Sequence, residues 1–209
     1  RAVLIFEDIR DRAWNETSCG GGAQWHWDDG PAGSSGYYKN AITTELYFAL
    51  AAKLALVTTD ATKRAYYQDW AQRSGDWMLN SGMIATRAGN SNSIGVEGLV
   101  SDGLCCWRFS ANLSACCADD TCSRAKGGCT ENEKNGMSCD NFCGADDMCV
   151  NNNDTQWTYN QGVILGGLAW LPAATGNSSL LGIGTAIANA TATTLVWPAP
   201  AAPVLKESC

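Results

Sequence analysis

The segment WTYNQGVILGGL, which begins at Trp157, joins side chains that could bind a sugar to the start of an apolar helix. Trp157 and Tyr159 offer flat rings for stacking on a pyranose, and Asn160 and Gln161 carry donors and acceptors suited to hydroxyl groups. The apolar residues behind them predict a buried helix, in which two adjacent glycines allow close approach of a neighbour. The segment therefore predicts one wall of a sugar cleft; the alternative is a buried helix whose first turn is merely polar.

A second group of aromatic and acidic residues follows the glycine turn at 19–22. Trp25 and Trp27 could form a stacking platform, and Asp28 could bind a hydroxyl group. The alternatives are ordinary packing on the glycine turn for the tryptophans and a solvated turn for Asp28 and Asp29. A retaining glycosidase needs two carboxyl groups roughly 5–5.5 Å apart, which adjacent residues reach only in a special backbone. Asp28 and Asp29 are therefore not assigned as a catalytic pair.

Helices arranged in antiparallel pairs are the elements expected to position these residues. The spacing of apolar residues predicts helices over 2–14, 38–57, 61–80, 157–174 and 178–195. Asp60 is expected to cap the third helix. The residues expected on the buried face of the second helix are Ala41, Ile42, Leu46, Ala49, Leu50 and Leu54. Pro172 is expected to kink or stop the fourth. Two such pairs favour an all-α helical array over a sandwich or a doubly wound sheet.

The cysteines mark out a segment between the helix pairs. Of the eleven cysteines, nine fall between Cys105 and Cys149, where helical periodicity is absent. Disulfides are the favoured use, because the only histidine, His26, lies far away and leaves an all-cysteine metal site as the alternative. Residues 105–149 are therefore predicted to be a disulfide-stapled insertion in one domain spanning 1–209. The cysteines expected in disulfides, with one left over, are Cys19, Cys105, Cys106, Cys116, Cys117, Cys122, Cys129, Cys139, Cys143, Cys149 and Cys209.

Five Asn-x-Ser/Thr sequons support the oxidising compartment that the cysteines imply, and together they predict a secreted or cell-surface glycoprotein. The apolar run 41–57 is interrupted by Glu45 and Lys53, so no membrane span is predicted. No basic segment with an apolar run opens the chain, so any signal peptide is expected to be removed or upstream. The sequons, some of them expected to be chance matches, stand at Asn15, Asn112, Asn153, Asn177 and Asn189.

Charge and composition exclude one class of partner. The formal net charge of -7 and the sequence pI of about 4.6 leave no basic stripe for phosphates, so a nucleic-acid partner is excluded. Nine tryptophans with only 17% charged residues suit an uncharged, hydroxyl-rich ligand, although tryptophan also fills cores. Carboxylates do not cluster at a recognisable loop spacing, so a metal is neither required nor excluded. We expect none at the catalytic centre, and no cofactor.

Four blocks of sequence, taken in order, resemble the endo-α-1,6-mannanases of glycoside hydrolase family 76. They are CGGGAQWHW at Cys19, YYKNAITTELYFALAAKLA at Tyr37, WMLNSGMI with VSDGL at Trp77 and Val100, and WTYNQGVILGGL at Trp157. The resemblance implies a six-hairpin α/α toroid, of which this chain would be a central portion, and a cleft that holds mannan. It also implies retaining cleavage by a consecutive Asp-Asp pair that lies upstream of the helix 2–14. No residue of this chain is therefore assigned as catalytic.

The resemblance adds two residues to the sugar-binding candidates. Asn40 would open the second helix and Asp102 lies in VSDGL, near the cleft of the family; their alternatives are a helix cap and a turn aspartate. The residues expected to bind mannan or a related glycan are Trp25, Trp27, Asp28, Asn40, Asp102, Trp157, Tyr159, Asn160 and Gln161.

Two functions from different classes stay open. The chain could be part of a secreted mannan-cleaving enzyme, with the rest of its own polypeptide supplying the catalytic pair. Alternatively, the scaffold could serve as a non-catalytic glycan-binding or structural glycoprotein in a cell-surface assembly with other chains. The cysteine-rich insertion and the odd cysteine favour the second function.

Overall fold

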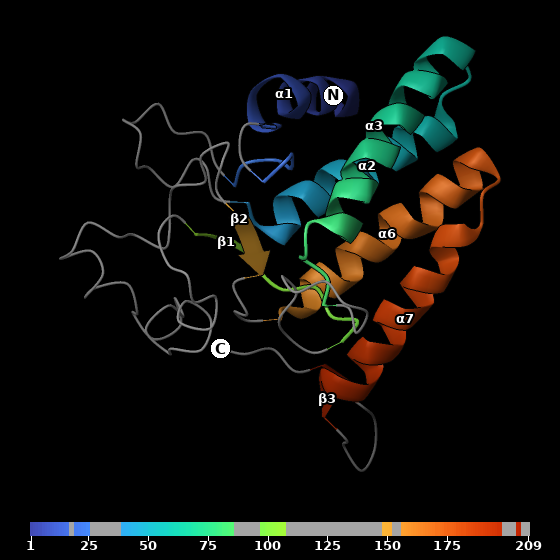
Figure 1. Ribbon diagram of the computed structural model, residues 1–209. Coiled ribbons are helices and arrows are strands. Elements are labelled where there is room, and N and C mark those ends of the chain that lie inside the picture. The colour runs from blue at the N-terminus through green and yellow to red at the C-terminus, as the bar shows by residue number, and fades with distance from the viewer. Residues whose placement is uncertain are drawn as a thin grey trace.

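The computed structural model describes residues 1–16, 19–25, 39–85, 97–107, 148–151, 156–197 and 204–205. These residues are mainly helical (Figure 1). The helices are α1 (Ala2–Asp8), continued by the π-helical turn η1 (Ile9–Ala13), α2 (Ala41–Val57), α3 (Ala61–Asn80), α6 (Thr158–Thr175) and α7 (Ser179–Thr194). The strands are β1 (Leu104–Trp107), β2 (Met148–Asn151), β3 (Val196–Trp197) and β4 (Val204–Leu205).

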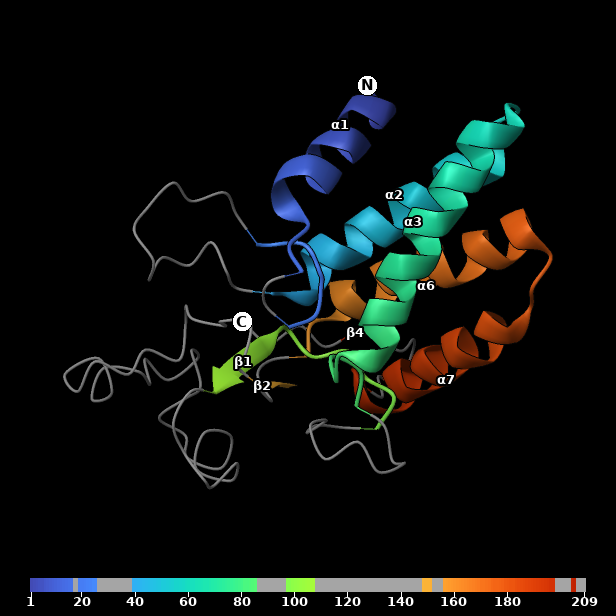
Figure 2. The same cartoon turned by 45° about the horizontal axis from the view of Figure 1, so that its top comes forward.

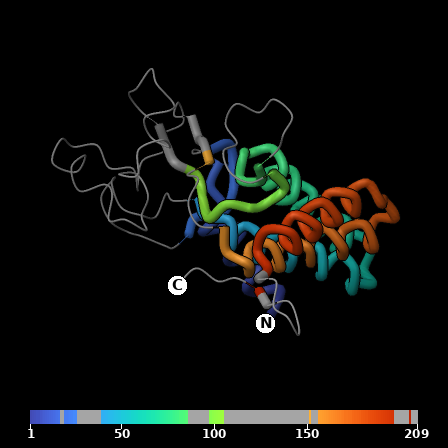
Figure 3. Tube along the Cα trace, turned by 90° about the horizontal axis from the view of Figure 1, so that it is seen from below, coloured from blue at the N-terminus to red at the C-terminus, as the bar shows by residue number. Residues whose placement is uncertain are grey.

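The helices form two antiparallel pairs, α2 with α3 and α6 with α7, as the sequence predicts. α2 packs on α1, α3 and α6, and α6 packs on α7. Figures 1 and 2 show that α2 and α6 start at the same end, beside β1 and β2, and that α3 and α7 run back toward it. Figure 3 shows the segment 97–107, in lime, crossing that end of the helices. The N-terminal turns of α2 and α6 therefore lie close to one connecting segment.

Caps and packing set the helix ends. Asp60 accepts a hydrogen bond from the Lys63 amide at 2.9 Å, which confirms the predicted N-cap of α3. Pro172 does not stop α6, which continues through it to Thr175 and ends at Gly176, whose φ is +76°. Pro172 is buried, so its packing offsets the single backbone hydrogen bond that proline cannot donate.

The buried face of α2 agrees only in part with the one predicted, since Ala41, Ala49 and Leu54 are buried as expected. Leu46 is 54% exposed and Leu50 is half-buried, whereas Glu45 and Phe48 are fully buried. The prediction assumed one apolar stripe, but α2 contacts helices on several sides, so burial does not follow a single face. The sequence therefore underestimates how far the polar residues of α2 are buried.

Glycine allows α6 to approach α2 as closely as predicted. A Cβ atom on Gly167 would lie 2.3 Å from ring carbons of Phe48, and one on Gly75 of α3 would lie 3.0 Å from the same ring. Phe48 is thus enclosed by glycines of two neighbouring helices. Because protein cores are densely packed, neither position has room for a larger side chain without movement of the ring.

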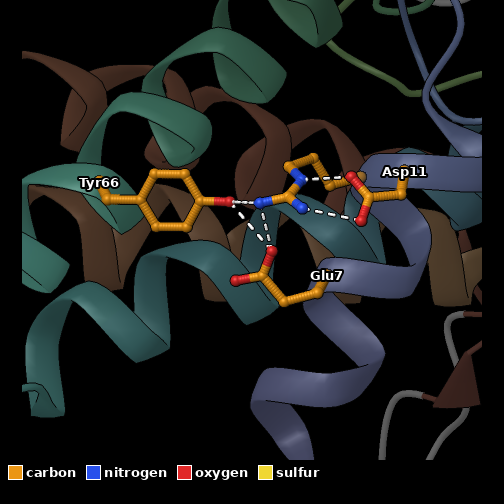
Figure 4. A network of polar contacts seen from close by, with 4 residues as sticks. Glu7, Asp11 and Tyr66 are labelled. Carbon is orange, nitrogen blue, oxygen red and sulfur yellow. Dashed lines mark hydrogen bonds and ion pairs between the residues drawn. The ribbon is translucent and has the colours of Figure 1, made fainter.

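A polar network joins α1 to α3 (Figure 4). The Arg10 guanidinium forms an ion pair with Glu7 and donates to the Tyr66 hydroxyl, and it also donates twice to Asp11, at 2.6 and 2.7 Å. The Tyr66 hydroxyl donates to Glu7 at 3.1 Å. Beneath it, Phe6 stacks on Tyr47 with ring centroids 5.1 Å apart. Exposed ion pairs add little stability, so the aromatic contacts are the main attachment of α1.

Two short sheets lie outside the predicted helical plan. β1 pairs antiparallel with β2, from Leu104 opposite Asn151 to Trp107 opposite Met148, so the base of the predicted insertion is a two-stranded sheet. β3 and β4, which follow α7, also pair antiparallel. Cys19 is disulfide-bonded. The predicted disulfides of the other cysteines lie outside the described side chains.

Several apolar side chains remain open to solvent. On α1, Val3, Leu4 and Ile5 are 43%, 72% and 55% exposed, and on α2 the side chains of Leu46 and Val57 are 54% and 58% exposed. Contiguous exposed apolar side chains of this kind usually mark a surface that another element covers. Their exposure agrees with the expectation that this chain is a portion of a larger helical array.

Candidate functional site

The segment from Val100 to Leu104 ties the starts of α2 and α6 together. The Gln161 carboxamide accepts from the Val100 amide at 2.8 Å and donates to the Val100 carbonyl at 2.8 Å. On the other side, the Ala41 amide donates to the Asp102 carbonyl at 2.8 Å, and the Leu104 amide donates to the Lys39 carbonyl at 3.1 Å. The segment is therefore held between the two helix starts.

Four polar residues gather at this place, and we call them the helix-start cluster: Glu45 of α2, Ser101 and Asp102 of the connecting segment, and Asn160 of α6. Glu45, Ser101 and Asn160 have no measurable exposure. Both Glu45 carboxyl oxygens, the Ser101 hydroxyl and both polar atoms of Asn160 have no hydrogen-bond partner among the described residues. Each such atom costs about 1–3 kcal/mol, so the cluster suits a polar partner that is not among these residues.

Electrostatics make Glu45 the unusual member of the helix-start cluster. Burial raises the pKa of its carboxyl group well above the usual range, and the nearby Asp102 carboxylate raises the pKa further. Two neighbouring carboxyl groups do not both ionise readily, because the negative charge on one disfavours ionisation of the other. The Glu45 carboxyl group thus keeps its proton to a higher pH than an exposed glutamate does, and in that form it can donate a hydrogen bond.

Lys39, just before α2, holds a hairpin against the same end of the helices. Its ammonium group is buried and donates to the carbonyl oxygens of Asn15, at 2.8 Å, and Gly22, at 2.6 Å. Burial lowers the pKa of Lys39 to about 7. The hairpin, residues 13–24, is closed by the Trp14–Ala23 bridge and by the Gln24 amide, which donates to the Ala13 carbonyl at 2.8 Å. A lysine beside a helix start is usually exposed, so the burial of Lys39 follows only from the tertiary structure.

The aromatic residues present their rings at the surface. Trp157 and Tyr159 stack on each other, with ring centroids 5.7 Å apart and planes 11° apart, and Tyr159 is 44% exposed. Trp25, at the end of the described hairpin region, is 40% exposed. A paired, partly exposed aromatic surface of this kind is suited to the apolar face of a sugar ring.

Two of the predicted binding residues have other partners. The Asn40 side chain accepts from the Thr43 amide at 3.3 Å and from its hydroxyl at 2.6 Å, which is the helix-cap alternative. Gln161 is 1% exposed and its carboxamide binds backbone, so it positions the connecting segment instead of offering a group to a ligand.

The remaining predicted residues divide by whether the structure describes them. Asp102 and Asn160 belong to the helix-start cluster, while Trp27 and Asp28 lie outside the described residues. Of the sequons, Asn177 and Asn189 are exposed and Asn15 is half-buried, whereas Asn112 and Asn153 also lie outside the described part.

Sequence reasoning missed the site roles of Glu45, Lys39 and Ser101. The signal for Glu45 was present, because it is an isolated charge within the apolar run 41–57. Such a charge argues against a membrane span, and it equally marks a buried group that needs a partner.

The described residues contain neither a membrane-spanning helix nor a group of potential metal ligands. No helix among them is both long and apolar enough to span a bilayer. Nor do three His, Cys, Asp or Glu side chains of these residues come together as potential metal ligands.

Comparison with known proteins was made by sequence and by structure. The sequence matches the family model of glycosyl hydrolase family 76 over residues 1–97 and 124–209. It is 29% identical over 180 residues to a mannan endo-1,6-alpha-mannosidase of Saccharomyces cerevisiae, covering 84% of this chain and 27% of that protein. It is 39% identical over 83 residues to a putative mannan endo-1,6-alpha-mannosidase of Schizosaccharomyces pombe, covering 40% of this chain and 17% of that protein. The chain thus spans about a quarter or less of the length of these curated relatives.

Two solved structures illustrate the likeness in fold. A family 76 mannosidase from Bacteroides thetaiotaomicron superposes with a TM-score of 0.58 at 18% identity, covering 95% of this chain and 38% of that one. An inactive variant of an α-1,6-mannanase from a Salegentibacter species, in complex with α-1,6-mannotriose, superposes with a TM-score of 0.56 at 18% identity, covering 91% and 38%. These likenesses confirm the predicted fold class, an all-α toroid of which the described helices form a part.

Proposed function

This chain belongs to glycosyl hydrolase family 76, and from that membership we propose that it forms part of an endo-acting α-1,6-mannosidase, in which it supplies one wall of the mannan-binding cleft. The observation that carries the proposal is the helix-start cluster. Its buried polar atoms lack partners among the described residues, and a polyhydroxylated substrate offers both donors and acceptors to satisfy them.

Asn160 and the aromatic pair have distinct roles in this proposal. The Asn160 carboxamide, whose polar atoms have no partner among the described residues, hydrogen-bonds adjacent hydroxyl groups of one mannosyl unit. Trp157 and Tyr159, three and one residues earlier, stack against a neighbouring unit. Gln161 acts on neither sugar directly, because its hydrogen bonds fix the connecting segment that carries Ser101 and Asp102.

Glu45 and Asp102 act in positioning instead of bond cleavage. Retaining hydrolysis needs one ionised and one protonated carboxyl group on opposite sides of the scissile bond. Glu45 forms no hydrogen bond with a described residue, and its place near the Asp102 carboxylate, whose charge favours the protonated form of Glu45, suits a positioning role. Asp102 then accepts from a substrate hydroxyl group.

The carboxylates that cleave the bond are assigned to a part of the protein outside these residues. Support comes from the length of the relatives, of which this chain covers about a quarter. The Salegentibacter α-1,6-mannanase is described as inactive when two consecutive aspartates are replaced by asparagine. Asp28 and Asp29 are consecutive, but they lie outside the described residues and are not proposed as that pair.

The test is hydrolysis by the full-length protein that contains this chain. We expect release of reducing ends from unbranched α-1,6-mannan, and Asn160→Ala should lower kcat/KM at least tenfold without changing the urea midpoint by more than a small amount. Thr62→Ala, at an exposed position of α3, is the control and should match the wild-type protein. Complete absence of turnover by a folded wild-type protein would reject the enzyme in favour of the non-catalytic glycan-binding protein.

We further propose that the protein is secreted or held at the cell surface. Support comes from the disulfide at Cys19 and from the exposure of the sequon asparagines Asn177 and Asn189. Treatment of the native protein with an N-glycosidase should lower its mass by whole glycans, and an unchanged mass would count against this localisation.

A further inference from the structure

A cavity of about 400 Å³ lies between the hairpin 13–24 and the last turns of α3. Trp14 and Glu16 of the hairpin line one side, and Arg73, Asp76, Trp77 and Asn80 of α3 line the other. None of its lining residues belongs to the helix-start cluster. We propose that this cavity is a second saccharide-binding site, which takes hexosyl units of the same polysaccharide at a distance from the bond being cut. The identity of that polysaccharide, α-1,6-mannan, rests on the proposed function.

The floor of the cavity is preformed by tryptophan and glycine. The Trp77 indole nitrogen donates to the Cys19 carbonyl at 2.9 Å, and a Cβ atom on Gly22 would lie 2.5 Å from the Trp77 ring. The Trp14 ring is held edge-on against Trp70, with centroids 5.6 Å apart and planes at 84°. The indole surfaces therefore do not have to reorganise when a ligand binds, which lowers the entropic cost of binding.

The rim of the cavity carries polar groups that are oriented but still exposed. The Glu16 carboxylate accepts from the Trp14 indole at 3.1 Å and from Arg73 at 3.3 Å. Asp76 accepts from Gln72 at 2.7 Å through its carboxylate. The Asn80 amide donates to the Asp76 carbonyl at 2.7 Å, which leaves its own oxygen as an acceptor. Donors and acceptors beside aromatic surface are the groups that bind sugar hydroxyls and ring faces.

The charge of the rim selects among ligands of suitable size. Two carboxylates, Glu16 and Asp76, face one guanidinium, Arg73, which is already paired with Glu16 and lies 4.6 Å over the Trp70 ring. The balance is negative, so phosphates and other anions are disfavoured. A purely apolar ligand would leave the polar groups of the rim without partners. A neutral polyol can hydrogen-bond to these groups and also lie against the indole rings of the floor.

The experiment compares two exposed aspartates. Asp76 lines the cavity, whereas Asp8, at the end of α1, pairs with Arg12, and neither of these two residues lines it. The full-length protein, freed of its own N-glycans by enzyme, is run through native gels that contain increasing amounts of soluble unbranched α-1,6-mannan. Retardation gives the apparent Kd for the wild-type protein and for Asp76→Ala, Asn80→Ala and Asp8→Ala.

We expect Asp76→Ala and Asn80→Ala each to raise the apparent Kd at least threefold, the loss expected for one or two hydrogen bonds. Asp8→Ala should stay within twofold of the wild-type protein, and all three variants should keep the wild-type urea midpoint. The second site is ruled out if wild-type retardation is absent, or if both cavity variants bind mannan as the wild-type protein does. A protein that binds but does not cleave would reject the proposed function alone.

Discussion

The Gln161 carboxamide pairs with both backbone groups of Val100, accepting from the amide and donating to the carbonyl at 2.8 Å in each case. The two hydrogen bonds have the pattern of a backbone pair in a β-sheet, but here a side chain at the start of α6 takes the place of one strand. It joins residues 61 positions apart in the sequence. The first turn of α6 therefore fixes the segment that carries Ser101 and Asp102.

Replacing Gln161 by leucine should destabilise the protein. The change leaves the buried amide and carbonyl of Val100 without partners, and each unpaired group costs about 1–3 kcal/mol. Urea unfolding should show a loss of a few kcal/mol. Gln72→Leu, on the exposed surface of α3, is the control and should change the free energy of unfolding by less than about 0.5 kcal/mol. Equal effects of the two changes would contradict the structural role of Gln161.

Lys39→Met should alter how stability depends on pH. The pKa of Lys39 is lowered to about 7 in the folded protein, from 10.5, so the unfolded chain binds more protons between these values. The contribution of Lys39 to stability therefore rises with pH from about 7 to about 10 and is constant below that window. The difference in unfolding free energy between the wild-type protein and Lys39→Met should grow in favour of the wild-type protein over this range. A constant difference would show that the Lys39 pKa is not lowered.

Glu45→Gln should give the opposite dependence on pH. Burial and Asp102 raise the pKa of Glu45 above its usual 4.5, so the folded protein keeps a proton that the unfolded chain releases. The wild-type protein then loses stability relative to Glu45→Gln as the pH rises above about 4.5. The two proteins should have similar urea midpoints near pH 4, and the variant should be the more stable at pH 7.5. A wild-type protein that is the more stable at pH 7.5 would indicate an ionised, partnered Glu45.

Gly167→Ala should destabilise the contact between α6 and α2. The new methyl group would lie 2.3 Å from the Phe48 ring, and overpacking of this kind costs about 1–3 kcal/mol. Gly162→Ala, in the same helix, meets no atom within 4 Å and should be neutral or stabilising through higher helix propensity. Thermal unfolding of the two variants measures the difference, and similar melting temperatures would contradict the packing described.

Much of the helical plan could be predicted from sequence because it depends on local periodicity. The helix over 61–80 was predicted to the residue, and its cap at Asp60 follows from a local side-chain preference. The sugar-binding candidates were harder to separate. Asn40 and Asn160 are both asparagines at helix starts, yet one caps its own helix and the other is buried without a partner among the described residues. Nothing local distinguishes them, because the difference lies in which neighbours surround each helix end.

The sequence by itself determined the positions of the helices, the family resemblance of its four blocks and the types of residue available to a sugar site, because these depend on neighbouring residues in the chain. Only the tertiary structure decided that Glu45 and Lys39 are buried, that Gln161 binds backbone, and that β1 and β2 close the base of the insertion. Each of these depends on contacts between distant segments. The free energy of a buried charge or amide is set by the neighbours that replace water around it, and the sequence does not state which neighbours those are.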